Sequence, residues 1–201
     1  MSDKNISVSF LFVYHEYSED TEKLMKTSLE SFFNEIGTSL DTESVSIART
    51  SKGKPYIVGL DNVHLSVTHS GAYCVVSVAF CETGVDLQQH ERLKTETAEQ
   101  ACERYLKLSK RFFHNDEYEY VKKDPLIRFF DVWTAKESYV KLTGDGIDDS
   151  FWSYSILDEN ASESLSSWKK RNVFFRIVPF LPDYTLCVCL SEPTTVKLIY
   201  K

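Results

Sequence analysis

The feature that most constrains the fold is one segment, DPLIRFFDVWTAKESYVKLTGDG, at residues 124–146. Asp124 is a favourable N-cap residue, and Pro125 suits the first helical position, where its missing N–H costs nothing. No further Pro or Gly occurs until Gly144, which is placed to end a helix at its C′ position. The segment therefore predicts a helix of roughly five turns, around which we expect the rest of the chain to be organised.

One face of this helix carries Trp133, Glu137 and Lys141 at positions i, i+4 and i+8. Because an α-helix has 3.6 residues per turn, the three side chains share nearly one stripe. Alone, this pattern is more typical of an exposed glutamate–lysine pair beside a core tryptophan. Its meaning depends on the motifs around it.

The remaining apolar patterns alternate between helical and strand spacing. Helices are predicted within residues 25–36, 95–108 and 115–121, and strands within residues 65–80, 173–178, 184–190 and 196–200. In the segment GVDLQ, Asp86 follows a turn and is flanked by apolar residues, so we expect it at the end of a strand, although an aspartate that completes the turn is an equal alternative. This order of elements predicts an α+β fold.

Composition limits the function classes. The 201 residues hold 23 basic and 30 acidic side chains, a net charge of −7, which argues against nucleic acid or an anionic membrane as the main partner. No stretch approaches the ~20 apolar residues needed to cross a bilayer, and the N-terminus alternates rather than forming the core of a signal peptide. The five cysteines form no C-x-x-C pair and indicate free thiols, so we expect a cytoplasmic protein.

Three motifs, in order along the chain, carry a family resemblance. They are LSVTHSGAYCVVSVAF at residues 65–80, GVDLQ at residues 84–88 and WTAKESYVKLTGDGI at residues 133–147. Together with Gly53-Lys54-Pro55-Tyr56 upstream, and Arg111-Phe112-Phe113 followed by Glu117, they resemble the 4′-phosphopantetheinyl transferase superfamily, in its two-lobed Sfp-type branch. The resemblance covers about half of the chain.

This resemblance implies a fold and an activity. The fold would consist of two similar α/β lobes related by pseudo-twofold symmetry, each a helix packed on a small, mainly antiparallel sheet, with residues 1–83 in the N-terminal lobe and 84–201 in the C-terminal lobe. The activity would be Mg²⁺-dependent transfer of the 4′-phosphopantetheine arm of coenzyme A to a serine of an acyl or peptidyl carrier protein, by a monomer. The alternative is a catalytically weak homologue that binds coenzyme A or a carrier protein.

The resemblance also assigns the residues of the reaction centre. Asp86 and Glu137 would be the metal ligands, and Lys141 would contact the α-phosphate. Glu137 is also a candidate general base for the carrier serine, and Glu117 is a second candidate, although it is equally typical of a solvated acid at a helix start. Gln88 stands where the family has a third acid, and its neutral amide could offer an oxygen or hold a metal-bound water.

The donor site is implied in the same way. Lys54 would lie against the nucleotide with the backbone of Gly53 and Pro55, while Thr68 and His69 match the pair that reaches the 3′-phosphate and pyrophosphate. The dense basic cluster of many family members is missing here.

Two further basic features follow from the same motifs. Only Arg49 and Lys52 accompany Lys54 upstream of the HSG segment, which predicts modest affinity for the 3′-phosphate. Lys136 matches the family motif and is equally consistent with a structural ion-pair partner.

Overall fold

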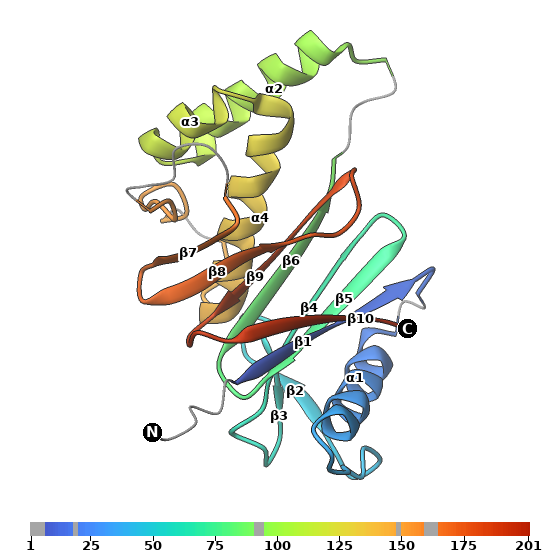
Figure 1. The fold of residues 1–201 in the computed structure, drawn as a ribbon. Coiled ribbons are helices and arrows are strands. Elements are labelled where there is room, and N and C mark those ends of the chain that lie inside the picture. Colours follow the sequence, from blue (N-terminus) through green and yellow to red (C-terminus); the bar gives the residue numbers. More distant parts are fainter. Residues whose placement is uncertain (1–6, 18–19, 91–94, 148–149, 159–164) are drawn as a thin grey trace, which may run out of the picture.

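The computed structural model describes residues 7–17, 20–90, 95–147, 150–158 and 165–201, and Figure 1 shows their arrangement. Helices and strands mix in an α+β fold, as the sequence predicts. Along the chain the elements are β1 (Val8–His15), α1 (Thr21–Glu35), β2 (Ile47–Arg49), β3 (Pro55–Ile57), β4 (His64–Ser70), β5 (Tyr73–Ala79), β6 (Thr83–Gln89), α2 (Ala98–Phe112), α3 (Asn115–Val121), α4 (Pro125–Thr143), β7 (Ser167–Lys170), β8 (Val173–Val178), β9 (Tyr184–Leu190) and β10 (Thr195–Tyr200).

The predicted long helix is confirmed as α4. Asp124 occupies its N-cap position, although its carboxylate accepts no capping hydrogen bond, and Pro125 opens the first turn. Gly144 ends the helix with φ at 75°, a left-handed conformation that glycine adopts without strain. No helix within the described ranges is long and apolar enough to cross a membrane.

The first sheet has the strand order β10-β1-β5-β4 and is covered on one face by α1. Side chains alternate along β1, so Phe10 and Phe12 face the helix and Leu11 and Val13 face the other way. Phe10 meets Phe32 of α1 edge to face, with ring centroids 5.6 Å apart. Strand β10 pairs in parallel with β1, so the last strand crosses the predicted lobe division at residues 83/84.

The second sheet is antiparallel, with the order β6-β9-β8-β7, and α4 packs across β6 and β9. Gly84 permits this packing, because a Cβ there would lie 2.0 Å from the carbonyl oxygen of Ser138 on α4. Helices α2 and α3 lie beyond α4 in Figure 1. Asp86 lies in the middle of β6 rather than at a strand end, because the strand begins three residues earlier, where Thr83 and Gly84 already pair with β9.

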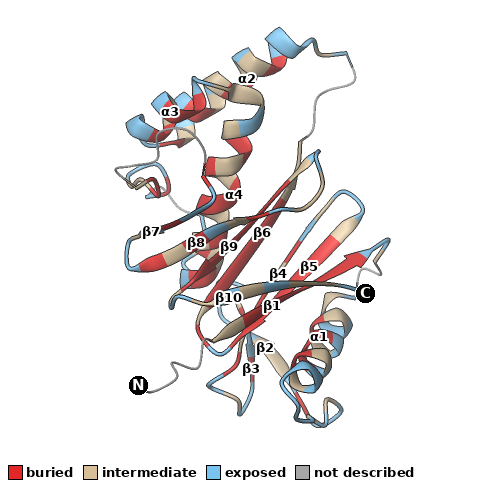
Figure 2. Ribbon diagram, in the orientation of Figure 1, coloured by how far each residue is buried: buried red, intermediate tan, exposed pale blue. Residues whose placement is uncertain are grey.

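A hydrophobic cluster fills the space between the two four-stranded sheets. Leu11 and Val13 of the first sheet meet Val85, Leu87 and other apolar side chains of the second. Because Val85 and Leu87 point into this shared core, the intervening Asp86 must point to the opposite face of β6, toward α4. Figure 2 shows that β6 is buried along most of its length.

Side-chain hydroxyls join β4 to β6 in an arrangement that we call the hydroxyl seam. The hydroxyl oxygens of alternate β4 residues each accept a backbone N–H from β6, at 3.0 Å for Ser66 and Val85, 3.3 Å for Thr68 and Leu87, and 2.9 Å for Ser70 and Gln89. The seam satisfies β6 amides that would otherwise be buried without a partner.

Candidate active site

The centre of the candidate site is Asp86, whose side chain is buried between β4, β6 and α4. Its Oδ1 accepts hydrogen bonds from Lys141 Nζ at 2.6 Å and from Thr68 Oγ1 at 3.0 Å. Its Oδ2 accepts one from Gln88 Nε2 at 2.9 Å. Three of the predicted site residues therefore contact the carboxylate of a fourth.

Glu137 lies one helical turn before Lys141 on α4 and is half-buried. The pKa of its carboxyl is raised to about 7, mainly because burial disfavours the charged form and secondarily because Asp86 repels it, while Lys141 opposes both effects. Two carboxyl groups thus share one site, with the Lys141 ammonium as the cation beside them.

The donor set fits a hard divalent cation. Within the described ranges, no three His, Cys, Asp or Glu side chains are grouped to hold a metal ion. The oxygen-bearing side chains at this centre are the carboxylates of Asp86 and Glu137 and the amide of Gln88. A bound cation would relieve the repulsion from Asp86, which after burial is the second cause of the raised Glu137 pKa. Magnesium suits such a set, because it keeps several waters and uses one or two carboxylates plus substrate phosphates.

A basic cavity of about 250 Å³ adjoins this centre at the C-terminal end of α4. Its walls come from the β2–β3 hairpin, β4, the end of α4 and the residues after it: Arg49, Lys52, Gly53, Lys54, Pro55, Ser66, Val67, Val140, Lys141, Gly144 and Gly146. The predicted nucleotide residues Lys54 and Pro55 therefore lie beside Lys141. The Lys54 ammonium is bound to the Glu82 carboxylate and the Leu142 carbonyl, so it also links the β2–β3 loop to the residue before β6 and to the last turn of α4.

The other two predicted donor residues lie elsewhere. Thr68 is buried against Asp86 rather than lining the basic cavity. His69, the next residue on β4, is exposed on the opposite face of the strand, where its ring lies 5.9 Å from that of Tyr17.

A second cavity, of about 370 Å³, adjoins the centre on the side of α2. Its walls are mainly aromatic and aliphatic: Tyr105, Leu108, Phe112, Phe129, Phe130 and Trp133, with Arg104 and the β-strand residues Ser70, Gln88 and Gln89. Gln88 thus lines this cavity and also donates to Asp86. We call it the apolar cavity.

Glu117 of α3 forms a separate ion pair with Lys136 of α4. Its carboxylate accepts hydrogen bonds from Lys136 Nζ at 3.1 and 3.3 Å and from the backbone N–H groups of Ile156 and His114, both at 2.9 Å. Both charged side chains are fully buried. Burial raises the pKa of the Glu117 carboxyl, against the opposing effect of Lys136. Lys136 is therefore an ion-pair partner, one of the two possibilities its motif position allows.

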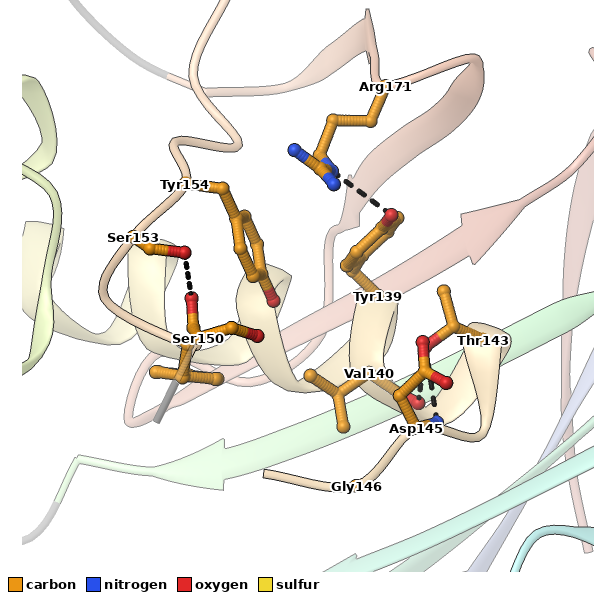
Figure 3. A pocket seen from close by; sticks show the side chains of 10 residues that line it. Tyr139, Val140, Thr143, Asp145, Gly146, Ser150, Ser153, Tyr154 and Arg171 are labelled. Atoms are coloured by element: carbon orange, nitrogen blue, oxygen red, sulfur yellow. Dashed lines mark hydrogen bonds between the residues drawn. The ribbon is translucent and has the colours of Figure 1, made fainter. Parts of the chain in front are cut away.

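A third cavity, of about 310 Å³, lies at the C-terminal end of α4 and shares Val140 and Gly146 with the basic cavity (Figure 3). Figure 3 shows Arg171 pointing between Tyr139 and Tyr154, and its Nε donates to the Tyr139 hydroxyl at 3.0 Å. Arg171 reaches this position from the β7–β8 turn, with φ at 52°. No sequence pattern indicates this cavity, because its walls come from three segments that only the fold brings together.

Comparison with known proteins gives one consistent result. Residues 82–189 match the model of the 4′-phosphopantetheinyl transferase superfamily. A 4′-phosphopantetheinyl transferase of Bacillus subtilis is 30% identical over 161 residues, which are 77% of this chain and 66% of that protein. The transferase psf-1 of Bacillus pumilus is 26% identical over 79% of this chain and 66% of its own length. The transferase Sfp of Bacillus subtilis strain 168 is 24% identical over 77% of this chain and 66% of its own length.

The chain thus spans about two thirds of the length of these curated relatives. The matched residues include Asp86, Gln88, Glu137 and Lys141, which the fold brings to one place. By these matches the chain belongs to the 4′-phosphopantetheinyl transferase superfamily, in its Sfp-type branch.

Proposed function

We propose that this chain transfers the 4′-phosphopantetheine arm of coenzyme A to a serine of an acyl or peptidyl carrier protein, and releases adenosine 3′,5′-bisphosphate. One observation supports this most directly. The centre formed by Asp86, Glu137 and Lys141 lies between a basic cavity, which shares Lys141, and the apolar cavity, which shares Gln88. Coenzyme A has the same order: an anionic nucleotide, a pyrophosphate and a weakly polar arm.

In this proposal the nucleotide phosphates occupy the basic cavity. Arg49, Lys52 and Lys141 supply positive charge there, and guanidinium and ammonium groups bind phosphate through charge-assisted hydrogen bonds. The pyrophosphate then lies beside Asp86 and Glu137. The phosphopantetheine arm extends toward the apolar cavity, where the carrier serine approaches.

The reaction is the attack of the serine hydroxyl oxygen on the β-phosphorus. A new P–O bond forms, the bond from that phosphorus to the bridging oxygen breaks, and the bisphosphate leaves with the electron pair. Glu137 takes the serine proton, directly or through a water. Lys141 stabilises the charge that develops on the α-phosphate.

Asp86 and Glu137 would hold Mg²⁺, with Gln88 contributing its amide oxygen or a bound water. The bound cation would supply charge neutralisation on the pyrophosphate. Glu117 remains a proposed second base, although its carboxylate is paired with Lys136.

We further propose that the protein is a cytoplasmic monomer of two lobes, residues 1–83 and 84–201, related by pseudo-twofold symmetry. The support for two lobes is that α1 packs on one four-stranded sheet and α4 on the other, although β10 of the second lobe joins the first sheet.

The test is mass spectrometry of apo acyl and apo peptidyl carrier proteins after incubation with coenzyme A, Mg²⁺ and this protein. We expect a mass gain of one phosphopantetheine group on the carrier serine, and none with the Glu137→Gln variant. Absence of any gain on both carrier classes would overturn the proposal.

The alternative is a binding module without turnover. The thin basic cluster and the neutral Gln88 in an acidic family position favour it. Calorimetry separates the two functions, since a module would bind coenzyme A or the carrier protein while the mass of the carrier stays unchanged.

A further inference from the structure

Thr68 is the residue of the hydroxyl seam that also contacts Asp86. Its Oγ1 lies 3.3 Å from the backbone nitrogen of Leu87 and 3.0 Å from Asp86 Oδ1. Thr68 is 5% exposed and Asp86 is 2% exposed, so water has little access to compete for either contact. The neighbours Ser66 and Ser70 make the same backbone contact at their own positions.

The direction of these hydrogen bonds follows from a count of protons. A hydroxyl group has one proton and can accept through its lone pairs. Thr68 accepts the N–H of Leu87, because a backbone amide can only donate. Its single proton is then donated to Asp86, whose carboxylate can only accept. The fold therefore fixes Thr68 as the donor to Oδ1.

Thr68 is poorly placed for the role that the family motif gives it. Its proton is already donated to Asp86, and it does not line the basic cavity, where β4 contributes Ser66 and Val67 instead. A phosphate in that cavity would therefore meet Arg49, Lys52 and Lys141 rather than the Thr68 hydroxyl.

We propose that Thr68 is a positioning residue, which holds the Asp86 carboxylate in the orientation needed to bind a divalent cation, and that it does not contact the nucleotide. The proposal rests on the proposed function in one respect: Asp86 is taken to be a cation ligand. Hydrogen bonds to metal-binding carboxylates typically contribute about 10- to 100-fold to metal affinity.

The first test needs no substrate. Thr68→Val removes the hydroxyl and keeps the side-chain shape, Thr68→Ser restores the hydroxyl, and Ser66→Ala removes a seam hydrogen bond that does not involve Asp86. Titration of the proteins with MgCl₂ in a calorimeter should show cation affinity about tenfold lower in Thr68→Val only. Equal affinity in Thr68→Val and wild type would overturn the proposal, as would an equal loss in Ser66→Ala.

The second test separates positioning from phosphate binding. The value of kcat/KM is measured with coenzyme A and with 3′-dephospho-coenzyme A for wild type and Thr68→Val. We expect the same fold loss with both donors, because Asp86 serves both. A loss confined to coenzyme A would show that Thr68 contacts the 3′-phosphate and would overturn the proposal.

A third measurement stands apart from the proposed function. In a crystal structure of Thr68→Val without cation or donor, we expect the Asp86 carboxylate to turn from its present orientation. An unchanged carboxylate would overturn the positioning role even in an active enzyme. If the wild-type protein bound no Mg²⁺ and modified no carrier, the proposed function would be refuted. A turned Asp86 carboxylate in Thr68→Val would still show that Thr68 positions it.

Discussion

Asp86 and Glu137 carry the same functional group in two different environments. Asp86 accepts hydrogen bonds from the side chains of Thr68, Gln88 and Lys141. Glu137 is half-buried and repelled by Asp86, so its pKa rises to about 7.

Glu137→Gln should abolish transfer and leave the fold intact. The substitution keeps the shape of the side chain but removes a metal ligand and possible base, and loss of such a group commonly costs ~10²-fold or more in rate. Turnover by mass spectrometry and the thermal unfolding midpoint test both parts. Near-normal turnover at saturating Mg²⁺ would contradict the assignment.

Gln88→Glu should bind Mg²⁺ as tightly as wild type, or more tightly. A third carboxylate strengthens a site for a hard cation. In the absence of the cation, however, the new carboxylate repels Asp86, and the hydrogen bond that the Gln88 amide donates to Asp86 is lost. We therefore also expect lower stability without Mg²⁺, recovered when Mg²⁺ is added, in thermal melts with and without a chelator. Loss of activity at saturating Mg²⁺ would mean that the Gln88 amide has a role of its own.

At the scale of elements, α4 presents two lysines in different directions. Lys141 reaches Asp86 on β6, whereas Lys136 is buried against Glu117 of α3 and donates to the Tyr154 carbonyl at 2.7 Å. The Lys136 ammonium also lies 4.2 Å from the centre of the Tyr154 ring. This second pair joins α3, α4 and the loop after α4.

Glu117→Gln should destabilise the protein by roughly 3 kcal/mol, because loss of one partner leaves the other charge buried and uncompensated. Urea unfolding measures this change. Lys122→Gln, which removes an exposed pair with Glu119, is the matched control and should change stability by less than about 1 kcal/mol. An unchanged unfolding midpoint in Glu117→Gln, together with lost turnover, would instead favour the catalytic role.

A second charged cluster lies just before β6, around Glu82. Glu82 contacts His64 Nδ1 at 3.2 Å and also binds the Lys54 ammonium. These partners lower the pKa of the Glu82 carboxyl to about 2, and the hydrogen bond with His64 has the largest effect. Burial acts in the opposite direction. Because the Glu82 pKa is lower in the folded protein than in the unfolded chain, the ionised carboxylate stabilises the fold above about pH 4.5. This stabilisation is lost as the pH falls toward 2.

Glu82→Gln should therefore be less stable than wild type at pH 7. The Glu82 side chain is 43% exposed, so solvent screening limits the difference to about 1 kcal/mol. The difference should shrink as pH falls from 4.5 to 2, as measured by urea unfolding at several pH values. A difference independent of pH would show that the carboxylate charge is not the cause.

The sequence predicts local features better than contacts. The ends of α4 follow from Pro125 and Gly144, whose effects are local. The partners of Lys136 and Thr68 do not follow from any pattern, because they depend on how α4 crosses β6 and α3. The family motif placed Thr68 with the nucleotide, whereas alternation along β4 turns it toward Asp86 and His69 away.

At the scale of the whole molecule, Lys54 links the β2–β3 loop, the turn before β6 and the end of α4. Its ammonium is already bound, so it can contribute little to a 3′-phosphate without losing these contacts. We expect a preference for coenzyme A over its 3′-dephospho form within about tenfold, ~1.4 kcal/mol.

Measurement of kcat/KM for both donors, in wild type and Lys54→Ala, tests this expectation. Lys54→Ala should lower the unfolding midpoint and change the donor preference little. A thousandfold preference in wild type would show that other basic residues reach the phosphate, and a preference abolished in Lys54→Ala would assign the phosphate to that lysine.

The pairing of β10 with β1 has a consequence for how the chain reaches its fold. Val8 and Thr195 are neighbours in the first sheet although almost the whole sequence separates them. Contacts between such distant residues slow folding, because a large loop must close before they form. During synthesis β1 can pair with β5 early, but its other edge stays open until the ribosome has released residues 195–200. We therefore expect docking of β10 to be a late step, during which the exposed edge of β1 is the point most open to misassociation with another chain.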